Sequence, residues 1–268
     1  MQVDIAIIGG GPAGLSAAIN ARARNKTVAV ITNDPADSPL WKAERVDNFL
    51  GLPGESGKEL LEGFRAHAET MEVQILPGKV LTAMAMDDGW MLSVGMDIVE
   101  AKAVILAAGV ARGQKFPGEE EHLGAGVSYC ATCDGMLYRG KTVAVLGYDS
   151  GARREAEFLR GMGCNVRYFE KPRHCVIRGA GQLDGITVEG EELTVDGVFI
   201  LRPTVAPTDL FPGLDTEDGF VSVNRRMETN LPGLFAAGDC TGRPLQLAKA
   251  TGEGQIAGQS AAAYAELH

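Results

Sequence analysis

Two cysteines separated by two residues carry the most specific chemistry in this sequence. Cys130 and Cys133 enclose two small residues, and Asp134 follows directly. A CxxC spacing permits a small disulfide ring and lowers the pKa of one thiol, so the pair suits thiol–disulfide exchange. Asp134 is placed to supply or accept the proton that such an exchange moves. A carboxylate at this place can equally cap a helix, and the sequence leaves both roles open.

The remaining cysteines do not complete a metal site. Zinc needs four ligands, yet the sequence has no second CxxC and no paired histidines, and His174 and Cys175 stand alone. We therefore predict no bound metal. The chain has five cysteines, an odd number that does not suit a disulfide-stapled secreted scaffold. We interpret Cys164, Cys175 and Cys240 as reduced packing residues.

A glycine-rich turn near the N-terminus predicts a dinucleotide site. Hydrophobic patterning predicts a strand over Val3–Ile8, a helix over Leu15–Ala23 and a second strand over Thr27–Thr32. In the GxGxxG turn between the first strand and the helix, the first glycine permits the tight turn. The second lets backbone approach a pyrophosphate, and the third lets the helix pack on the strand. The residues of this turn are Gly9, Gly11, Pro12, Ala13 and Gly14.

Further apolar strands extend this unit. They are expected over Ala103–Gly109, Gly197–Leu201 and Gly233–Asp239. The last of them ends in Gly238 and Asp239, and the Asp239 carboxylate can accept hydrogen bonds from a ribityl hydroxyl. The tail from residue 246 to 267 is expected to be helical beyond a glycine-rich turn at 251–254.

A fainter copy of the strand–turn–helix unit begins at Thr142, with Gly147 in the place of the first glycine. Arg112-Gly113 and Arg202-Pro203 have the composition of linkers. We therefore predict an α/β protein with two Rossmann-like dinucleotide-binding domains, the second inserted into the first and degenerate. The first domain would span residues 1–112 and 203–268, and the inserted domain, which bears the CxxC pair, residues 113–202.

Composition excludes several classes of partner. The formal net charge is −10 and the sequence pI is about 5.0, so nucleic acid and anionic membranes would be repelled. The first residues carry no basic segment, and every apolar run is interrupted well before the length of a bilayer span. We expect a cytoplasmic protein with no nucleic-acid or membrane partner.

The sequence resembles the low-molecular-weight thioredoxin reductases from end to end. The resemblance is carried by the turn at 9–14, by 46–48 (VDN), by 127–135 (VSYCATCDG) and by 234–239 (LFAAGD). It implies a homodimeric flavoenzyme that acts on a thioredoxin-like protein. Cys133 would face the flavin, Cys130 would attack the substrate disulfide, and Asp134 would be the acid. It also implies that FAD is lined by Gly9, Gly11, Gly14, Asn48, Gly109, Asp239 and Gln246.

The sequence departs from this family at the second nucleotide site. Asp149 occupies a position where the family needs a glycine, and at about 4 Å its charge would oppose a phosphate by roughly 4 kcal/mol at an effective dielectric of about 20. The arginine pair that the family uses for the 2′-phosphate of NADPH is also missing. The resemblance is therefore strongest to the ferredoxin-dependent flavin thioredoxin reductases, in which reduced ferredoxin supplies the electrons.

Other electron routes remain open in the sequence. Glu170 could bind the ribose of NAD while Arg153 or Arg154 offsets Asp149. Other shortened relatives resemble flavin-dependent dithiol oxidases that use oxygen, and a non-catalytic flavin-binding module is a third possibility. The segment 153–178 has seven basic and three acidic residues. This segment is either a solvated surface or a docking site for an acidic ferredoxin.

Overall fold

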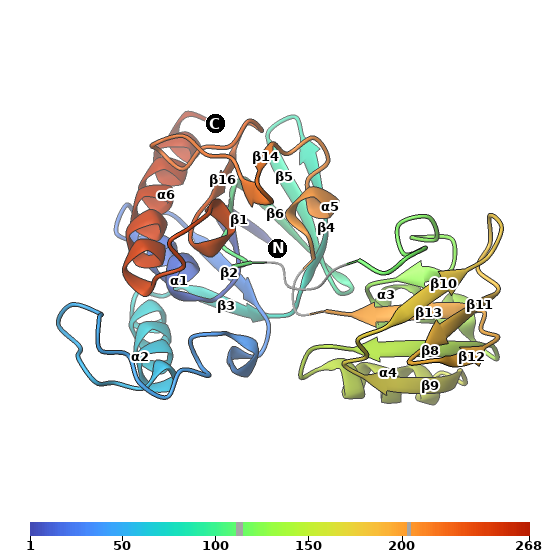
Figure 1. Cartoon of the computed structure of the whole chain (residues 1–268). Coiled ribbons are helices and arrows are strands. Elements are labelled where there is room, and N and C mark those ends of the chain that lie inside the picture. Colours follow the sequence, from blue (N-terminus) through green and yellow to red (C-terminus); the bar gives the residue numbers. More distant parts are fainter. Residues whose placement is uncertain (111–114, 203–204) are drawn as a thin grey trace. The chain divides into compact units, whose positions relative to one another are not determined.

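The structure, a computed structural model, describes residues 1–110, 115–202 and 205–268. The chain divides into unit 1, Met1–Ala111 with Thr204–His268, and unit 2, Arg112–Pro203 (Figure 1). Of the predicted linkers, Arg112-Gly113 and Pro203 lie outside the described residues. Among the described residues, no helix is long and apolar enough to cross a membrane.

Unit 1 is built on a seven-stranded sheet. Its strands are β1 (Gln2–Ile8), β2 (Val28–Thr32), β3 (Gln74–Pro77), β4 (Val80–Met86), β5 (Gly89–Val94), β6 (Asp97–Leu106) and β16 (Leu234–Ala236). Their order is β3-β2-β1-β6-β5-β4, and β16 pairs with the end of β6. The pairs β3–β2, β2–β1, β1–β6 and β6–β16 are parallel, whereas β5 pairs antiparallel with both β4 and β6. The parallel part is the Rossmann-like half that the glycine turn predicts.

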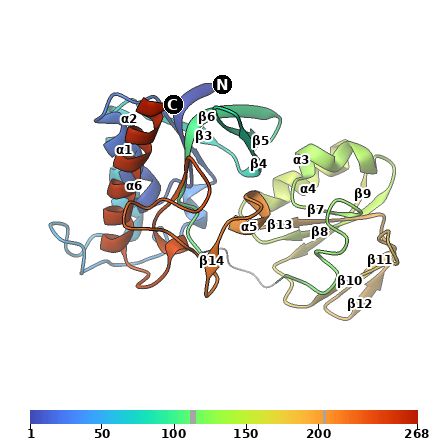
Figure 2. The same cartoon turned by 90° about the horizontal axis from the view of Figure 1, so that it is seen from above.

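Three helices, α1 (Pro12–Arg22), α2 (Gly57–Thr70) and α6 (Leu247–Leu267), gather on one face of this sheet (Figures 1 and 2). A Cβ at Gly254 would lie 2.1 Å from the Ala13 carbonyl oxygen, and one at Gly258 would lie 2.3 Å from that of Ala17. These glycines let α6 approach the backbone of α1. The predicted turn at 251–254 is therefore wrong, because this segment lies inside the continuous helix α6, where Gly254 permits the close packing. Short elements complete the unit: α5 (Pro207–Leu210), β14 (Thr216–Glu217) and β15 (Phe220–Val221).

Unit 2 has a four-stranded parallel sheet covered on both faces. The strands are β7 (Val127–Ser128), β8 (Thr142–Gly147), β9 (Asn165–Glu170) and β13 (Gly197–Leu201), in the order β7-β13-β8-β9. One face carries α3 (Ala131–Asp134) and α4 (Ala152–Gly161), and the other an antiparallel sheet of β10 (Cys175–Arg178), β11 (Gly185–Val188) and β12 (Glu191–Leu193) (Figure 2). Alternate residues of β8 enter different cores, Val143 and Val145 on the helix side and Ala144 and Leu146 on the other. Both faces of β8 are thus buried, which explains its unbroken apolar sequence.

The predicted fold class, α/β with two Rossmann-like units, is confirmed. The predicted element boundaries differ in detail. Helix α1 begins at Pro12 instead of Leu15, because proline is well suited to the first position of a helix. The strand predicted to reach Gly109 ends at Leu106, and the strand predicted to reach Asp239 ends at Ala236.

Candidate active site

One edge of the unit 1 sheet brings three predicted cofactor-binding segments together. Gly9 follows β1, Gly109 lies three residues beyond β6, and Gly238 lies two residues beyond β16. These three strands are parallel neighbours, so their carboxyl ends meet at the same edge. Ligands of open α/β sheets bind at this edge.

The glycines of the first turn divide into two kinds. Gly9 has φ +114°, and a Cβ there would lie 2.3 Å from the Ala107 carbonyl oxygen, while one at Gly14 would lie 1.9 Å from that of Gly9. These two glycines are required by packing. By contrast, a Cβ at Gly11 or Gly109 would meet no atom within 4 Å. The space beside them can receive a dinucleotide, and Gly11 is the N-cap residue of α1, where backbone N–H groups favour a pyrophosphate. The residues present therefore fit FAD.

Two further predicted residues, 198 positions apart, form a direct hydrogen bond. The Asn48 side-chain amide donates to Gln246 Oε1 at 2.9 Å. Gln246 is the N-cap residue of α6. The helix end and the loop that carries Asn48 are thus joined by two of the side chains assigned to FAD.

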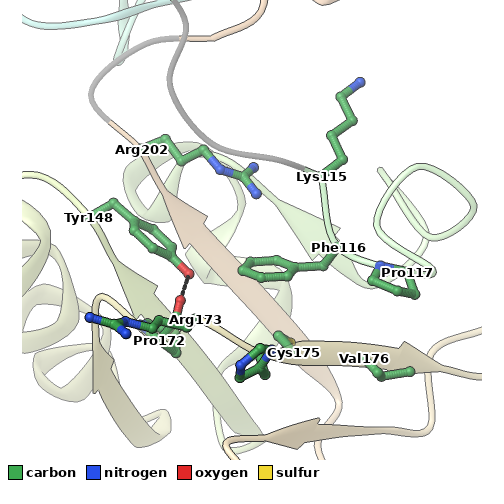
Figure 3. A pocket seen from close by; sticks show the side chains of 10 residues that line it. Lys115, Phe116, Pro117, Tyr148, Pro172, Arg173, Cys175, Val176 and Arg202 are labelled. Atoms are coloured by element: carbon green, nitrogen blue, oxygen red, sulfur yellow. Dashed lines mark hydrogen bonds between the residues drawn. The ribbon is translucent and has the colours of Figure 1, made fainter.

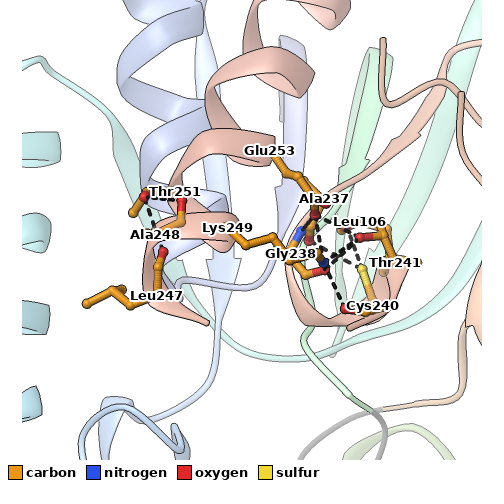
Figure 4. Close-up of polar contacts among 11 residues, drawn as sticks. Leu106, Ala237, Gly238, Cys240, Thr241, Leu247, Ala248, Lys249, Thr251 and Glu253 are labelled. Atoms are coloured by element: carbon orange, nitrogen blue, oxygen red, sulfur yellow. Dashed lines mark hydrogen bonds and ion pairs between the residues drawn. The ribbon is translucent and has the colours of Figure 1, made fainter. Parts of the chain in front are cut away.

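The loop after β16 is held by a polar network that the sequence reasoning missed (Figure 4). Lys249 Nζ donates to the carbonyl oxygens of Gly238 and Gly242, each at 2.8 Å, and lies 3.1 Å from Glu253 Oε2. The Glu253 carboxylate accepts from the Gly238 N–H at 2.9 Å and from the Thr241 hydroxyl at 2.7 Å. Both backbone groups of Gly238 are therefore fixed, directly before Asp239. Only the i,i+4 spacing of Lys249 and Glu253 hinted at this network.

In unit 2, Cys130 and Cys133 form a disulfide with Cα atoms 5.4 Å apart. Cys130 is the N-cap residue of α3, and its Sγ accepts a hydrogen bond from the Cys133 N–H at 3.1 Å. Cys130 is only 7% exposed, whereas Cys133 is exposed. The sequence-predicted pair is thus present, with the two sulfurs in different surroundings.

Asp134 accepts a hydrogen bond from the buried Ser128 hydroxyl at 2.6 Å. The same hydroxyl oxygen accepts from the Cys130 N–H at 3.0 Å, so Ser128 connects the carboxylate to the cysteine backbone. The helix-capping alternative for Asp134 is wrong, because the capping contact of α3 comes from Cys130 Sγ and Asp134 makes no side-chain cap bond to the following 3-10 turn. Sequence reasoning did not select Ser128, although it belongs to the 127–135 motif.

The other three cysteines are free and buried. Burial raises the pKa of Cys175 to about 11 and that of Cys240 to about 12, and it also raises the pKa of Cys164. They are neutral thiols at neutral pH and are unsuited to exchange chemistry. Their expected role as packing residues agrees with this placement. No cluster of metal-ligating side chains occurs among the described residues.

The edge of the unit 2 sheet that corresponds to a nucleotide site is occupied by side chains. Tyr148 follows β8 directly, and its hydroxyl donates to the Pro172 carbonyl at 2.6 Å. Burial raises the pKa of Tyr148, so the ring stays neutral. Asp149 lies in the turn that leads into α4, whose first turn also carries Glu155. The Asp149 carboxylate therefore lies at the helix end where a pyrophosphate would bind, whereas the Glu155 carboxylate accepts a hydrogen bond from the Ala131 N–H at 3.2 Å.

The basic segment 153–178 is largely neutralised by ion pairs within unit 2. Four of its arginines contact carboxylates: Arg153 with Glu170, Arg160 with Glu157, Arg167 with Glu191 and Arg178 with Glu192. The first of these pairs is 2.6 Å long and joins Glu170, which the NAD alternative assigns to the ribose, with Arg153, one of the two arginines that this alternative offers to offset Asp149. The net positive charge available on this segment is smaller than the sequence count indicates.

Comparisons with known proteins agree with this geometry. The family model described as pyridine nucleotide-disulphide oxidoreductase matches residues 3–182 and 173–254. The thioredoxin reductase of Aquifex aeolicus is 36% identical over 88% of this chain and 84% of its own, and that of Bacillus subtilis is 31% identical over 98% and 95%. A solved ferredoxin-flavin thioredoxin reductase of Clostridium acetobutylicum is 40% identical, with a TM-score of 0.94 and coverage of 100% of this chain and 98% of that chain.

Proposed function

Because the chain belongs to the pyridine nucleotide-disulphide oxidoreductase family and is an FAD-binding thioredoxin-disulfide reductase, we propose that it takes its electrons from reduced ferredoxin. In this proposal the electrons pass through FAD and the Cys130/Cys133 pair to a thioredoxin-like protein. Flavin can accept electrons singly and deliver them as a pair, which suits a one-electron donor and a two-electron disulfide.

The occupied nucleotide edge of unit 2 is the observation that supports a donor other than NAD(P)H. A pyridine dinucleotide needs small residues in the turn and a helix end free for its pyrophosphate. Here the turn contains Tyr148 and Asp149, and the Tyr148 hydroxyl is bound to Pro172. The ion pair between Arg153 and Glu170 engages the candidate for the ribose contact and one of the two arginine candidates for the phosphate contact. The similarity to the Clostridium acetobutylicum enzyme supports the same donor.

Residues around the first turn would hold FAD at the edge of the unit 1 sheet. The open space at Gly11 and Gly109 and the N-terminus of α1 suit the pyrophosphate. Asp239 would accept hydrogen bonds from ribityl hydroxyls, and the Asn48–Gln246 pair would border the same site. The complete proposed set is Gly9, Gly11, Pro12, Ala13, Gly14, Asn48, Gly109, Gly238, Asp239 and Gln246.

Cys130 is proposed as the thiol that attacks the substrate. After the Cys130–Cys133 disulfide is reduced, the N–H of Cys133 favours a thiolate on Cys130, because a hydrogen bond to a charged form stabilises it. The Cys130 thiolate attacks one sulfur of the substrate disulfide, forms a mixed disulfide and releases the other sulfur as a thiolate. Asp134, held by Ser128, would move the proton that this sulfur takes up. Cys133 then attacks Cys130, which restores the disulfide and releases the second substrate sulfur.

An exposed apolar surface lies beside the cysteine pair. Met136 is 64% exposed and Leu137 is 68% exposed, and both follow Asp134 in the 3-10 turn Gly135–Tyr138. Exposed apolar residues next to a reactive site are suited to recognition of a partner protein. We expect this surface to contact the thioredoxin-like substrate during exchange.

A homodimer and a cytoplasmic location complete the proposal. Light scattering of the purified protein measures the oligomeric state. Fractionation of the source cells tests the cytoplasmic location. A monomer at micromolar concentration would exclude the dimer.

The donor is tested by anaerobic titration of the FAD-loaded enzyme. NADPH, NADH and enzymatically reduced ferredoxin are added separately while the flavin absorbance is followed. We expect only reduced ferredoxin to bleach the flavin, and the same mixture to reduce thioredoxin. Bleaching by stoichiometric NADPH or NADH would overturn the proposal.

Oxygen consumption distinguishes the dithiol oxidase alternative. The enzyme is mixed aerobically with dithiothreitol in the absence of ferredoxin and thioredoxin. We expect slow oxygen uptake, and rapid turnover here would assign the reaction to the oxidase class.

A further inference from the structure

The cysteine pair lies on the helix-covered face of the unit 2 sheet. Ala131, directly after Cys130, is buried in one core with Ala156 of α4. Phe116 and Tyr148, which line the cavity in Figure 3, pack against the core on the opposite face. Helix α4, and not the cavity, therefore borders the turn that carries the disulfide.

Glu155 of α4 makes a direct contact with this turn. Its Oε2 accepts a hydrogen bond from the Ala131 N–H at 3.2 Å, although the two residues are 24 positions apart. Glu155 is half-buried and Ala131 is completely buried. The small side chains of Ala131 and Ala156 at the contact between α3 and α4 let the two helices lie close together. A carboxylate is thus fixed at the residue next to Cys130.

The same turn directs a hydrogen-bond donor at the Cys130 sulfur. Its Sγ accepts from the Cys133 N–H at 3.1 Å and lies 3.3 Å from Thr132 Oγ1. Such contacts stabilise the negative charge that forms on this sulfur when the disulfide is reduced. The Ala131 N–H, by contrast, donates to Glu155. Two opposing influences therefore meet at Cys130, a donor that favours a thiolate and a carboxylate that disfavours it.

We propose that the charge of Glu155 lowers the reduction potential of the Cys130–Cys133 disulfide, which makes the reduced pair a stronger reductant. On reduction the disulfide takes two electrons from reduced FAD and one proton, the S–S bond breaks, and a Cys130 thiolate and a Cys133 thiol remain. The disulfide is neutral and the thiolate is charged, so a neighbouring carboxylate opposes only the reduced form. Cys130 is 7% exposed, and solvent ions screen this interaction little. Glu155 acts here as a positioning residue, through the turn that it holds and the charge that it places beside Cys130.

This inference rests on the Cys130 thiolate of the proposed function, but not on the electron donor or on the identity of the substrate. A lower reduction potential of the enzyme disulfide shifts the exchange equilibrium towards a reduced thioredoxin-like protein. Failure of ferredoxin to reduce the flavin would leave the potential of the disulfide unchanged. The two proposals therefore fail in different experiments.

Redox titration of the FAD-loaded enzyme tests the proposal. Anaerobic mixtures of reduced and oxidised dithiothreitol set the ratio of dithiol to disulfide, and alkylation after acid quenching traps the free thiols. Mass spectrometry then measures the reduced fraction of the peptide that contains Cys130 and Cys133. Glu155→Gln removes the charge and keeps an oxygen that can accept from the Ala131 N–H. We expect the equilibrium constant for reduction of the disulfide to rise about tenfold in this variant, which is about 30 mV.

Two further variants separate the charge from the shape of the side chain. Glu155→Asp keeps the charge but shortens its reach, so it should change the equilibrium constant by less than about threefold. Glu157→Gln removes another carboxylate of α4, which contacts Arg160, and should have the value of the parent. Hydrogen exchange of the β8 amides checks that unit 2 is folded in each variant. Equal potentials in Glu155→Gln and the parent, or a shift of equal size in Glu157→Gln or Glu155→Asp, would overturn the proposal.

A second measurement isolates Cys130. In the Cys133→Ser background, Cys130 is alkylated with iodoacetamide at about pH 6, where the thiolate is the reacting form. Addition of Glu155→Gln should raise this rate about threefold, because the thiolate fraction rises while the intrinsic reactivity of the sulfur falls. A shifted potential with an unchanged alkylation rate would mean that the charge acts on Cys133. That result would overturn both this inference and the role proposed for Cys130, whereas an unchanged potential would overturn this inference alone.

Discussion

The Arg202 guanidinium binds the Glu119 carboxylate through two nitrogens, Nη1 at 2.5 Å and Nη2 at 2.8 Å. The Glu119 side chain is completely buried and also accepts from the Phe116 N–H and the Tyr129 hydroxyl, each at 2.9 Å. The two charged residues are 83 positions apart and lie near the beginning and the end of unit 2. This pair therefore ties the first segment of unit 2 to the end of β13.

Glu119→Gln should destabilise unit 2. It removes one charge of a buried pair and leaves Arg202 without its counterion, a change that typically costs about 3–5 kcal/mol. Hydrogen exchange of the β13 amides measures the effect in unit 2 directly, with the β1 amides as an internal reference. The double variant Glu119→Gln, Arg202→Met should recover part of the loss. Equal hydrogen exchange of the β13 amides in Glu119→Gln and the parent would show that the ion pair does not stabilise unit 2.

The same pair predicts a dependence of stability on pH. Burial by itself raises the pKa of Glu119, but the hydrogen bonds from Arg202 and Phe116 and the charge of Arg202 outweigh it and bring the pKa below 4.5. The stabilisation that ionised Glu119 provides is therefore complete above the pKa of the unfolded state. It is lost as the pH falls through the lower pKa of the folded state. Urea unfolding between about pH 6 and pH 3 should show a smaller acid loss in Glu119→Gln than in the parent. Equal losses of stability in Glu119→Gln and the parent over this pH range would contradict this assignment.

Serine variants of the cysteine pair should separate two steps. Cys133→Ser should keep FAD, stop reduction of the substrate and trap thioredoxin as a mixed disulfide on Cys130, since the resolving sulfur is absent. Cys130→Ser should still allow ferredoxin to reduce the flavin but should abolish turnover. Mass spectrometry identifies the trapped adduct and absorbance follows the flavin. An adduct that forms only through Cys133 would reverse the two roles, and the exposure of Cys133 makes this control necessary.

Lys249→Met should weaken FAD binding. The change removes two hydrogen bonds to the carbonyls of Gly238 and Gly242 and leaves Glu253 without its cation. Loss of about 1–3 kcal/mol corresponds to roughly five- to 150-fold lower affinity for FAD. Fluorescence titration of the apoenzyme with FAD measures the affinity of each variant. Lys102→Met, which removes a lysine that contacts Asp4, serves as the matched control. Equal FAD affinity in both variants would show that the network does not position the cofactor.

Ferredoxin-driven flavin reduction should slow steeply as salt rises, because screening reaches about 8 Å at physiological ionic strength. Stopped-flow absorbance at several salt concentrations measures this rate. Reversal of Arg153 and Arg154 to Glu should slow it further and leave reduction of the flavin by dithiols intact. Arg65→Glu in unit 1 is the control. If the rate of flavin reduction by ferredoxin is independent of salt, or is unchanged in the double variant, ferredoxin does not dock on the segment 153–178.

The sequence alone was sufficient for the fold class and for the cysteine pair, because both depend on local spacing. The GxGxxG turn occurs where β1 must stop and α1 must start, and only glycine fits at Gly9 and Gly14. The CxxC spacing similarly places two sulfurs within reach of each other in any turn of helix. The residues that carry out the chemistry of each motif are close neighbours in the sequence, so the sequence alone reveals them.

Only the tertiary structure brought distant side chains together. Nothing local to Asn48 predicts its hydrogen bond with Gln246, and nothing local to Glu119 predicts Arg202, because parallel strand order and helix packing decide which chain segments meet. The glycines at 252 and 254 show the converse. Their sequence favours a turn, but burial of α6 against Ala13 and Ala17 stabilises a continuous helix in which Gly254 permits the contact. The helix forms in spite of the local preference because its packing on α1 stabilises it by more than its three glycines destabilise it.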